Sequence, residues 1–289
     1  MKVVVLGPNG QLGSDIFAAN ARNGGGIDIE GVGRDALDVT DLDRIEGVLG
    51  PMSFDALVNC TSYHKTDEVE KNASLAFTIN AHAVQRMATV CAGKGARFVH
   101  ISTDYVFSGD ATEPYVEEDR PGPLNVYGAS KLMGEGLARN AHDDTLVLRV
   151  ASLFGVAGAS GKGGNFVETM IRVAKERGEL RVVDDITMSP TATEDVARTR
   201  LKMLQTEAPP GIYHAVNSEP ATWYRFAVEI VKGAGVRAEV TPVTSEEFPT
   251  VAARPHYSVL DNRKVGGILE GMPSWCDALQ RYLRAKGHA

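Results

Sequence analysis

The stretch KVVVLGPNGQLG at residues 2–13 decides the fold of this chain. Its apolar run, Lys2–Leu6, has the composition of a buried strand. Gly7, Gly10 and Gly13 follow that run and lead into an amphipathic segment at residues 11–22. In this setting glycines allow a tight turn and let the backbone approach a pyrophosphate, whose charge then lies at a helix N-terminus. We therefore predict a dinucleotide-binding loop; the alternative is a plain turn between a strand and a helix.

Short apolar runs alternate with helix-length amphipathic segments through the rest of the first half. The runs are rich in Val, Ile, Leu and Phe without strict alternation, which is typical of strands buried on both faces. Right-handed crossovers between such strands give an α/β fold with a doubly wound parallel sheet. The further predicted strands are 27–32, 56–59, 97–102 and 146–150, and the predicted helices after the first are 42–49, 74–93 and 126–140.

After Val150 the pattern changes, which predicts a second, smaller lobe. A glycine-rich stretch at 155–164 repeats the glycine spacing at Gly158, Gly161 and Gly164, but no strand precedes it and we interpret it as a loop. We expect residues 1–150 to form an NAD(P)-binding domain, joined by part of 187–210, and residues 151–289 to form mainly a substrate-binding lobe. Its predicted helices are 166–177, 194–205, 223–232 and 275–285.

Composition excludes several classes of protein. The chain has 289 residues, 43% of them hydrophobic, and a formal net charge of −7 spread along its length, which argues against a nucleic-acid partner. No apolar run approaches the roughly 18 residues that span a bilayer, so no membrane partner is expected. The odd number of widely spaced cysteines, Cys60, Cys91 and Cys276, fits free thiols in a reducing compartment, and we expect a cytoplasmic protein.

Two further patterns point to chemistry. Tyr127 and Lys131 lie four residues apart in a predicted helix, so the ammonium should lower the pKa of the phenol and prepare it for proton exchange with a carbonyl or alcohol. Tyr282 and Lys286 repeat this spacing, where we expect only packing and a solvated charge. The second pattern, STDY at residues 102–105, follows a predicted strand at the edge where open α/β sheets bind ligands. A helix cap or turn is the alternative reading of these residues.

In these residues the chain resembles the extended short-chain dehydrogenase/reductase superfamily, which is Rossmann-like, and within it the dTDP-4-dehydrorhamnose reductase family. The resemblance covers nearly the whole chain. It rests on GPNGQLGSD at 7–15, LDVTD at 37–41, VNCTSYHKTDEVE at 58–70, STDYVFSG at 102–109, PLNVYGASKLMGE at 123–135, SPTATEDVA at 189–197, GIYH at 211–214 and RPHYSVLDNRK at 254–264.

The resemblance implies an NAD(P)H-dependent reduction of the C4 ketone of a nucleotide-linked deoxysugar. Tyr127 would be the general acid, Lys131 would hold the nicotinamide ribose and tune Tyr127, Thr103 would lie beside the ketone, and Asp104 would contact the sugar. The other cofactor-binding residues would be Gly7, Gly10, Gln11, Leu12 and Gly13 at the pyrophosphate, Asp38 and Val39 at the adenine, and Ser62, Tyr63 and His64 along the cofactor.

Three more residues are candidates for holding phosphate groups. Arg34 follows the second predicted strand, where an arginine suits the 2′-phosphate of NADP, so we expect NADPH, with NADH tolerated. Arg254 is a guanidinium in the second lobe, where the diphosphate of a nucleotide sugar needs a bidentate partner; a surface ion pair is its alternative. Asn165, beside the glycine-rich stretch, is a further candidate for binding the substrate phosphates.

Departures from the family pattern fall mostly in the substrate half. Leu153 stands where many members have a tryptophan, and residues 186–188, Ile-Thr-Met, replace a Gln-Gly-like pair. We expect a missing aromatic platform and a lost amide to change how the sugar is held. The family's dimer is linked by Mg²⁺, but only Asp15 and Glu194 match its acidic residues, so we expect no structural metal and leave a homodimer open.

Two alternatives belong to other classes. An epimerase or dehydratase would share the glycine loop and the Tyr/Lys pair, but such dehydratases typically carry an adjacent Asp-Glu, and here Asp104 is followed by Tyr105. A non-catalytic, NADP-binding regulatory subunit, like the methionine adenosyltransferase β subunit, could keep all of these residues. Oxidation of NAD(P)H by the purified protein with a ketosugar separates the enzyme from the regulator.

Overall fold

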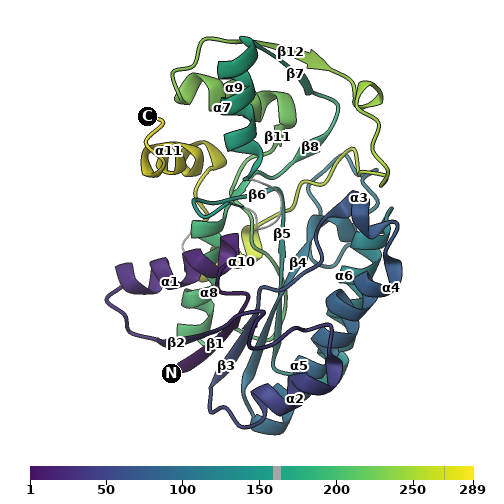
Figure 1. The fold of residues 1–289 in the computed structure, drawn as a ribbon, viewed down its shortest axis with the longest axis vertical. Helices are drawn as coiled ribbons and strands as arrows, with labels where there is room; N and C mark the ends of the chain where they lie inside the picture. Colours follow the sequence, from purple (N-terminus) through teal and green to yellow (C-terminus); the bar gives the residue numbers. More distant parts are fainter. Residues whose placement is uncertain (159–163, 270) are drawn as a thin grey trace.

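A six-stranded parallel sheet forms the centre of the molecule in this computed structural model, which describes residues 1–158, 164–269 and 271–289 (Figure 1). The strand order is β10-β5-β4-β3-β1-β2. Because β2 lies on one side of β1 and β3 on the other, the order in which strands are added reverses between β1 and β3. Ligands of doubly wound sheets bind at such a switch point. The strands are β1 (Lys2–Leu6), β2 (Asp28–Val32), β3 (Ala56–Asn59), β4 (Arg97–Thr103), β5 (Thr145–Val150) and β10 (Gly211–His214).

Helices cover both faces of this sheet, which confirms the predicted α/β fold. One face carries α1 (Gln11–Arg22), α8 (Thr193–Gln205) and α10 (Arg263–Leu269), and the other carries α2 (Leu42–Leu49), α5 (Ala83–Lys94) and α6 (Val126–Ala141) (Figure 1). Successive residues of β1 alternate between the two cores: Val3 and Val5 pack on the α1 side, and Val4 and Leu6 on the α2 side. This two-sided burial explains the unbroken apolar run in the sequence.

The predicted helix over 74–93 is interrupted in the structure. It comprises α4 (Ala73–Phe77), a π-helical turn η1 (Thr78–His82) and α5. A π turn inserts an extra residue into the helix, and such turns are frequent at functional sites. Here the turn contains Asn80, a fully buried polar residue.

A second lobe stands at the carboxyl edge of the sheet, built on α7 (Phe166–Arg177), α9 (Trp223–Gly233) and α11 (Trp275–Ala285) (Figure 1). Its core includes Phe226 and the fully buried Trp275. Three strand pairs complete it: β6 (Leu153–Phe154) with β9 (Thr191–Ala192), β7 (Glu179–Val183) with β12 (Glu239–Val243), and β8 (Thr187–Met188) with β11 (Ala221–Thr222). Short helical turns lie at α3 (Thr66–Val69), η2 (Asp104–Val106) and η3 (Ser245–Glu247).

The chain returns from this lobe to the sheet before ending in the lobe. The helix predicted at 194–205, within the part of 187–210 expected to join the first domain, is α8; it packs against α1 because its apolar residues Val196, Leu201 and Leu204 join the core under the sheet. β10 then adds the sixth strand, which was not predicted, beside β5. Among the helices of the described residues, none is long and apolar enough to cross a membrane.

Candidate active site

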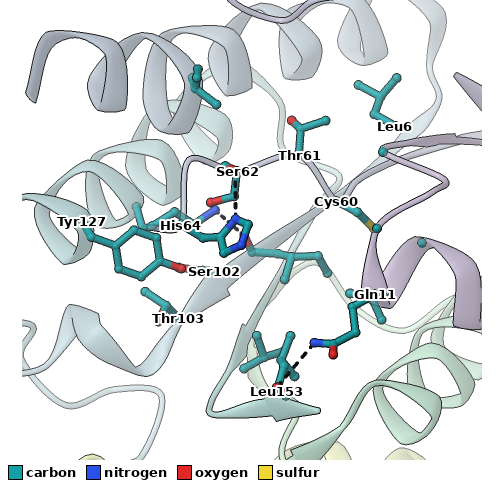
Figure 2. A pocket seen from close by; sticks show the side chains of 18 of the residues that line it. Leu6, Gln11, Cys60, Thr61, Ser62, His64, Ser102, Thr103, Tyr127 and Leu153 are labelled. Atoms are coloured by element: carbon teal, nitrogen blue, oxygen red, sulfur yellow. Dashed lines mark hydrogen bonds between the residues drawn. The ribbon is translucent and has the colours of Figure 1, made fainter. Parts of the chain in front are cut away.

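A cavity of about 650 Å³ lies at the carboxyl ends of the strands, between the sheet and the second lobe. Figure 2 shows Tyr127, Thr103, Ser62 and Ser102 together on one side of it, and Gln11 with Leu153 on the other. Its wall includes most of the residues named from the sequence: Gly7, Gly10, Gln11, Leu12, Gly13, Arg34, Asp38, Val39, Ser62, His64, Thr103, Asp104, Tyr127 and Lys131. Tyr63, Asn165 and Arg254 are not part of that wall.

The glycine loop between β1 and α1 forms one end of the cavity. Gly7 has a φ of +76°, in the left-handed region that favours glycine. A Cβ on Gly13 would lie 2.2 Å from the carbonyl oxygen of Gly7, so the first turn of α1 packs too closely on the loop for any side chain. Gly10 is the N-cap of α1 and offers no side-chain cap, which leaves the first backbone N–H groups of the helix available to an anion.

The second glycine-spaced stretch differs from this loop. Gly158 and Gly164 also have positive φ, but they follow β6 of the second lobe rather than a strand of the sheet. Gly161 lies outside the described residues.

A cation follows β2 at the rim of the cavity. The guanidinium of Arg34 is largely exposed, with a side chain 81% accessible, and it donates from Nε and Nη2 to Asp38 Oδ2 at 3.1 and 3.0 Å. Asp38 Oδ1 accepts from the backbone N–H and the hydroxyl of Thr40, and these hydrogen bonds hold the pKa of Asp38 below its usual value. The carboxylate thus holds Arg34 beside the cavity while most of the guanidinium stays open to a second anion.

Asn80 of the π turn fixes the loop after β3. Its Oδ1 accepts from the Tyr63 backbone N–H at 2.9 Å and from the Ser62 hydroxyl at 3.2 Å, and its Nδ2 donates to Tyr63 O and to the Ser130 hydroxyl of α6. Tyr63 is therefore held through its backbone. We expected Tyr63 to lie along the cofactor, but its side chain is not part of the cavity wall. No sequence signal singles out Asn80, because the same helical segment also carries Gln85 and other polar residues.

Thr103 and Asp104 end β4 and begin η2. The Thr103 hydroxyl donates to Asp104 Oδ1 at 3.0 Å and accepts from the Tyr105 backbone N–H at 3.2 Å, so it does act as the helix cap considered as an alternative. Burial raises the pKa of Asp104 to about 6, although hydrogen bonds from Ser258 and Thr103 oppose the rise. Both residues nevertheless line the cavity.

Tyr127 has a raised pKa, which corrects the prediction that Lys131 lowers it. Burial dominates the rise, and hydrogen bonding to the Thr103 and Ser62 hydroxyls opposes it only in part. Lys131 does not offset the rise because its Nζ donates to the Ile101 carbonyl oxygen at 2.6 Å and lies 3.3 Å from His100 Nε2. Tyr127 is therefore protonated at neutral pH and can donate its proton, although as a weaker acid than a tyrosine of ordinary pKa.

A buried ion pair supports these residues from beneath. Arg149 of β5 donates to both carboxylate oxygens of Glu135 of α6, at 3.0 and 2.8 Å, and both side chains are at most 3% exposed. The hydroxyl of Ser102 donates to the same carboxylate. Ser102 is therefore bound to a structural carboxylate, and β4, β5 and α6 are tied together directly below Thr103 and Lys131.

Two predicted phosphate-binding residues have protein partners. Asn165 is the N-cap of α7: its Oδ1 accepts from the Glu168 backbone N–H, and its Nδ2 donates to Gly155 O and the Tyr282 hydroxyl, both at 3.1 Å. Tyr282 itself is buried, as expected from packing. These contacts give Asn165 a structural role instead of an open amide.

Arg254 forms the ion pair considered as its alternative. Its Nη2 donates to Asp67 Oδ2 at 2.8 Å, and its Nη1 donates to the Tyr105 hydroxyl at 3.3 Å. Tyr105 lines the cavity and lies edge-on to Tyr127, with ring centroids 6.0 Å apart. Arg254 therefore stands behind the cavity wall.

Aromatic side chains that the sequence analysis missed line the other end of the cavity. Phe154, Phe166, Trp223 and Phe226 come from β6, α7 and α9, and the rings of Phe166 and Trp223 lie 4.7 Å apart at 55°. The cavity therefore has aromatic rings at this end, although position 153 itself is a leucine. Residues 186–188 are not in the wall, and Met188 is buried in β8 beside β11; the effect expected from the lost amide stays a prediction.

The two acidic residues considered for Mg²⁺ both have protein partners. Asp15 accepts a hydrogen bond from the Thr193 hydroxyl, and burial raises its pKa. Glu194 pairs with Arg22 at 3.0 Å and with Arg281. The absence of a structural metal stays a prediction.

Comparison with known proteins agrees with this arrangement. Residues 1–287 match the RmlD substrate binding domain family. The chain belongs to this family. It is 35% identical over 288 residues to the spore coat polysaccharide biosynthesis protein SpsK of Bacillus subtilis, covering 100% of this chain and 99% of SpsK. It is 34% identical over 295 residues to a dTDP-4-dehydrorhamnose reductase of Mycobacterium tuberculosis, covering 100% of this chain and 94% of that protein.

Solved structures of RmlD family members share the fold over nearly the whole chain. A dTDP-4-dehydrorhamnose reductase of Clostridium acetobutylicum superposes with a TM-score of 0.92 at 35% identity, with 99% of each chain covered. One from Bacillus anthracis, solved in complex with NADP, superposes with a TM-score of 0.90 at 37% identity, with 98% of this chain and 99% of that chain covered. The resemblance seen in the sequence motifs is thereby confirmed.

Proposed function

We propose that this protein is an NADPH-dependent reductase of the C4 ketone of dTDP-4-dehydro-L-rhamnose. One observation carries the proposal: Thr103, Tyr127 and Lys131 line the same cavity as the glycine loop, so a proton donor lies next to a dinucleotide-binding loop. The reductase names of the M. tuberculosis and B. anthracis relatives support this substrate.

The residues at the dinucleotide end fit NADPH. Gly13 lets the first turn of α1 pack closely on the glycine loop, and the uncapped N-terminus of α1 supplies N–H donors for the charge of a pyrophosphate. Arg34, held by Asp38, stands after β2, where it can bind the 2′-phosphate that distinguishes NADPH from NADH. The dinucleotide, when bound, supplies the hydride.

The protein's own groups supply the proton and the orientation. Tyr127 donates its phenolic proton to the oxygen on C4, and its raised pKa keeps that proton in place at neutral pH. The Thr103 hydroxyl is positioned to hydrogen-bond the same oxygen or its neighbour. Lys131 lies one helical turn after Tyr127, lines the same cavity and would hold the nicotinamide ribose.

The aromatic end of the cavity suits the base of the nucleotide sugar. Phe166 and Trp223 both line the cavity, and a thymine ring can stack on an aromatic side chain of this kind. We expect Trp223→Ala to raise the KM for the nucleotide sugar about tenfold with a smaller change in kcat, and Trp223→Phe to restore most of it. An unchanged KM in Trp223→Ala contradicts a stacking role.

The alternatives fit less well. In the described chain Asp104 is followed by Tyr105, whose hydroxyl accepts from Arg254, so the adjacent second carboxylate typical of the dehydratases is lacking there. A regulatory subunit needs no proton donor, yet Tyr127 and Thr103 both face the cavity. The homodimer and the cytoplasmic location remain predictions; light scattering of the purified protein tests the first.

The test is an NADPH-oxidation panel of dTDP-, UDP- and GDP-linked 4-ketosugars, with product stereochemistry determined by NMR. We expect the dTDP-linked rhamnose precursor to be the best substrate. NADPH binding without turnover of any ketosugar supports the regulatory subunit, and a product with an inverted centre but no net oxidation of NADPH supports an epimerase.

A further inference from the structure

A chain of buried polar contacts lies behind Tyr127, and the proposed mechanism does not use it. It joins Asn59 at the end of β3, His100 in β4 and Lys131 in α6, whose exposed fractions are 0%, 0% and 1%. His100 Nδ1 lies 3.4 Å from Asn59 Nδ2, and His100 Nε2 lies 3.3 Å from Lys131 Nζ. Each imidazole nitrogen therefore has one partner from a different element.

Thr61 fixes the orientation of the Asn59 amide. Its Oδ1 accepts from the backbone N–H of Thr61 at 2.9 Å and from the Thr61 hydroxyl at 2.6 Å. A backbone N–H can only donate, so Oδ1 must face Thr61, and Nδ2 must face His100. His100 Nδ1 then has to accept, and a neutral imidazole carries its single proton on Nε2.

This assignment bears on the charge of Lys131. An ammonium has only donors, so it cannot bond to an Nε2–H, whereas a neutral amine offers a lone pair. The Lys131 amine also donates to Ile101 O at 2.6 Å, which either form can do. All the hydrogen bonds from Thr61 through Asn59 and His100 to Lys131 are therefore satisfied together only when Lys131 is neutral.

We propose that Asn59 and His100 are positioning residues that stabilise the neutral amine of Lys131 through this directed chain of hydrogen bonds. Lys131 then gives up and regains a proton easily during the reaction cycle. Only this consequence for turnover rests on the proposed function; the preference of the hydrogen bonds for a neutral Lys131 follows from the contacts alone.

Burial lowers the pKa of Lys131, whereas the other groups around it raise that pKa. The Glu135 carboxylate favours the charged amine, but Arg149 already pairs with it, and Cys60 has a smaller effect of the same sign. Burial opposes them and lowers the pKa of Lys131 to about 8. Burial also lowers the pKa of His100 well below its usual value, so the imidazole is neutral at pH 7, as the argument requires.

The tautomer of His100 is measured by ¹⁵N NMR of histidine-labelled protein, with its signals assigned from their absence in His100→Gln. We expect the Nε2–H tautomer at pH 9, above the pKa of about 8 at which Lys131 loses its proton. His214 is an internal reference of the opposite kind, because its Nδ1 faces the Asp261 carbonyl oxygen and must carry the proton. This measurement needs no substrate, so it decides the inference whether or not the protein reduces a ketosugar.

Asn59→Asp replaces one side-chain atom and should reverse the donor and acceptor roles in the hydrogen bonds from residue 59 through His100 to Lys131. A carboxylate accepts from Nδ1–H, which leaves Nε2 free to accept from a charged Lys131. We expect the tautomer to invert and the Lys131 titration, followed by ¹³Cε-lysine NMR, to move up by about one pH unit, the effect of roughly one hydrogen bond. His100→Gln can turn its amide oxygen to Lys131 without adding charge, so it should move the titration the same way.

An Nδ1–H or doubly protonated His100 in the unmodified protein overturns the proposal. A Lys131 titration that His100→Gln leaves unmoved also overturns it, and this second variant decides the question if Asn59→Asp does not fold.

Discussion

Asp104 is the residue whose replacement should separate stability from function most clearly. The residue is 3% exposed, and hydrogen bonds from the Thr103 and Ser258 hydroxyls only partly offset the burial of its carboxylate. Its pKa of about 6 means that the folded protein carries a buried, poorly compensated charge above that pH. Asp104→Asn removes this charge and keeps an acceptor for the Thr103 hydroxyl.

The raised pKa of Asp104 gives the sign and the size of the expected change in stability. The folded state binds the proton more tightly than the unfolded chain, so stability is lost as the pH rises from 3.8 to about 6 and stays low above it. A rise of about two pKa units corresponds to about 3 kcal/mol. We therefore expect Asp104→Asn to raise the free energy of unfolding by up to about 3 kcal/mol at pH 8 and to change it little near pH 4. With 2–4 °C per kcal/mol, Tm rises by roughly 6–12 °C at pH 8.

Calorimetry of both proteins between pH 4 and pH 8 measures this difference. Asp143→Asn is the control, because Asp143 is exposed and its replacement relieves no buried charge. If Asp104 contacts the sugar as proposed, kcat/KM falls in the same variant that gains stability. A variant that is less stable than the parent at pH 8, or equally shifted at both pH values, refutes the reasoning.

Three further substitutions test separate parts of the site. Tyr127→Phe should lower kcat by about 10²–10⁴-fold, while the Kd for NADPH, measured by fluorescence, stays within about twofold. An unchanged kcat would exclude Tyr127 as the general acid. Arg34→Ala should weaken NADPH binding about 10–100-fold through the loss of a charge-assisted hydrogen bond and leave NADH unaffected, and equal losses for both dinucleotides would exclude a 2′-phosphate contact. Glu135→Gln should cost about 3–5 kcal/mol in urea unfolding because it leaves Arg149 buried without a partner charge, whereas Glu176→Gln, in an exposed pair, should cost less than about 1 kcal/mol.

The sheet and its glycine loop could be predicted because their determinants are local. β1 is a continuous apolar run, and Gly13 must be a glycine whatever the rest of the chain does. The helix α1 also has its predicted bounds. By contrast, β10 is a four-residue strand whose place beside β5 depends on where α8 packs, and no local pattern encodes that.

The residues that were missed owe their positions to long-range packing. Trp223 and Phe166 reach the cavity from helices that are adjacent only in the folded lobe, so the departure at Leu153 gave no hint of them. The raised pKa of Tyr127 likewise comes from burial, which residue spacing does not encode. Spacing correctly paired Tyr127 with Lys131 on one helix, but it could not foresee that Lys131 turns to His100 and Ile101.

Direct transfer of hydride to C4 is the central claim, and isotope transfer tests it most directly. The protein is incubated with dTDP-4-dehydro-L-rhamnose and each of the two epimers of [4-²H]NADPH in turn, and the product is examined by ²H and ¹H NMR. We predict that one of the epimers places a single deuterium at C4 of the sugar and that Tyr127→Phe slows this transfer without moving the label. A product that carries no deuterium at C4 with either epimer contradicts the account.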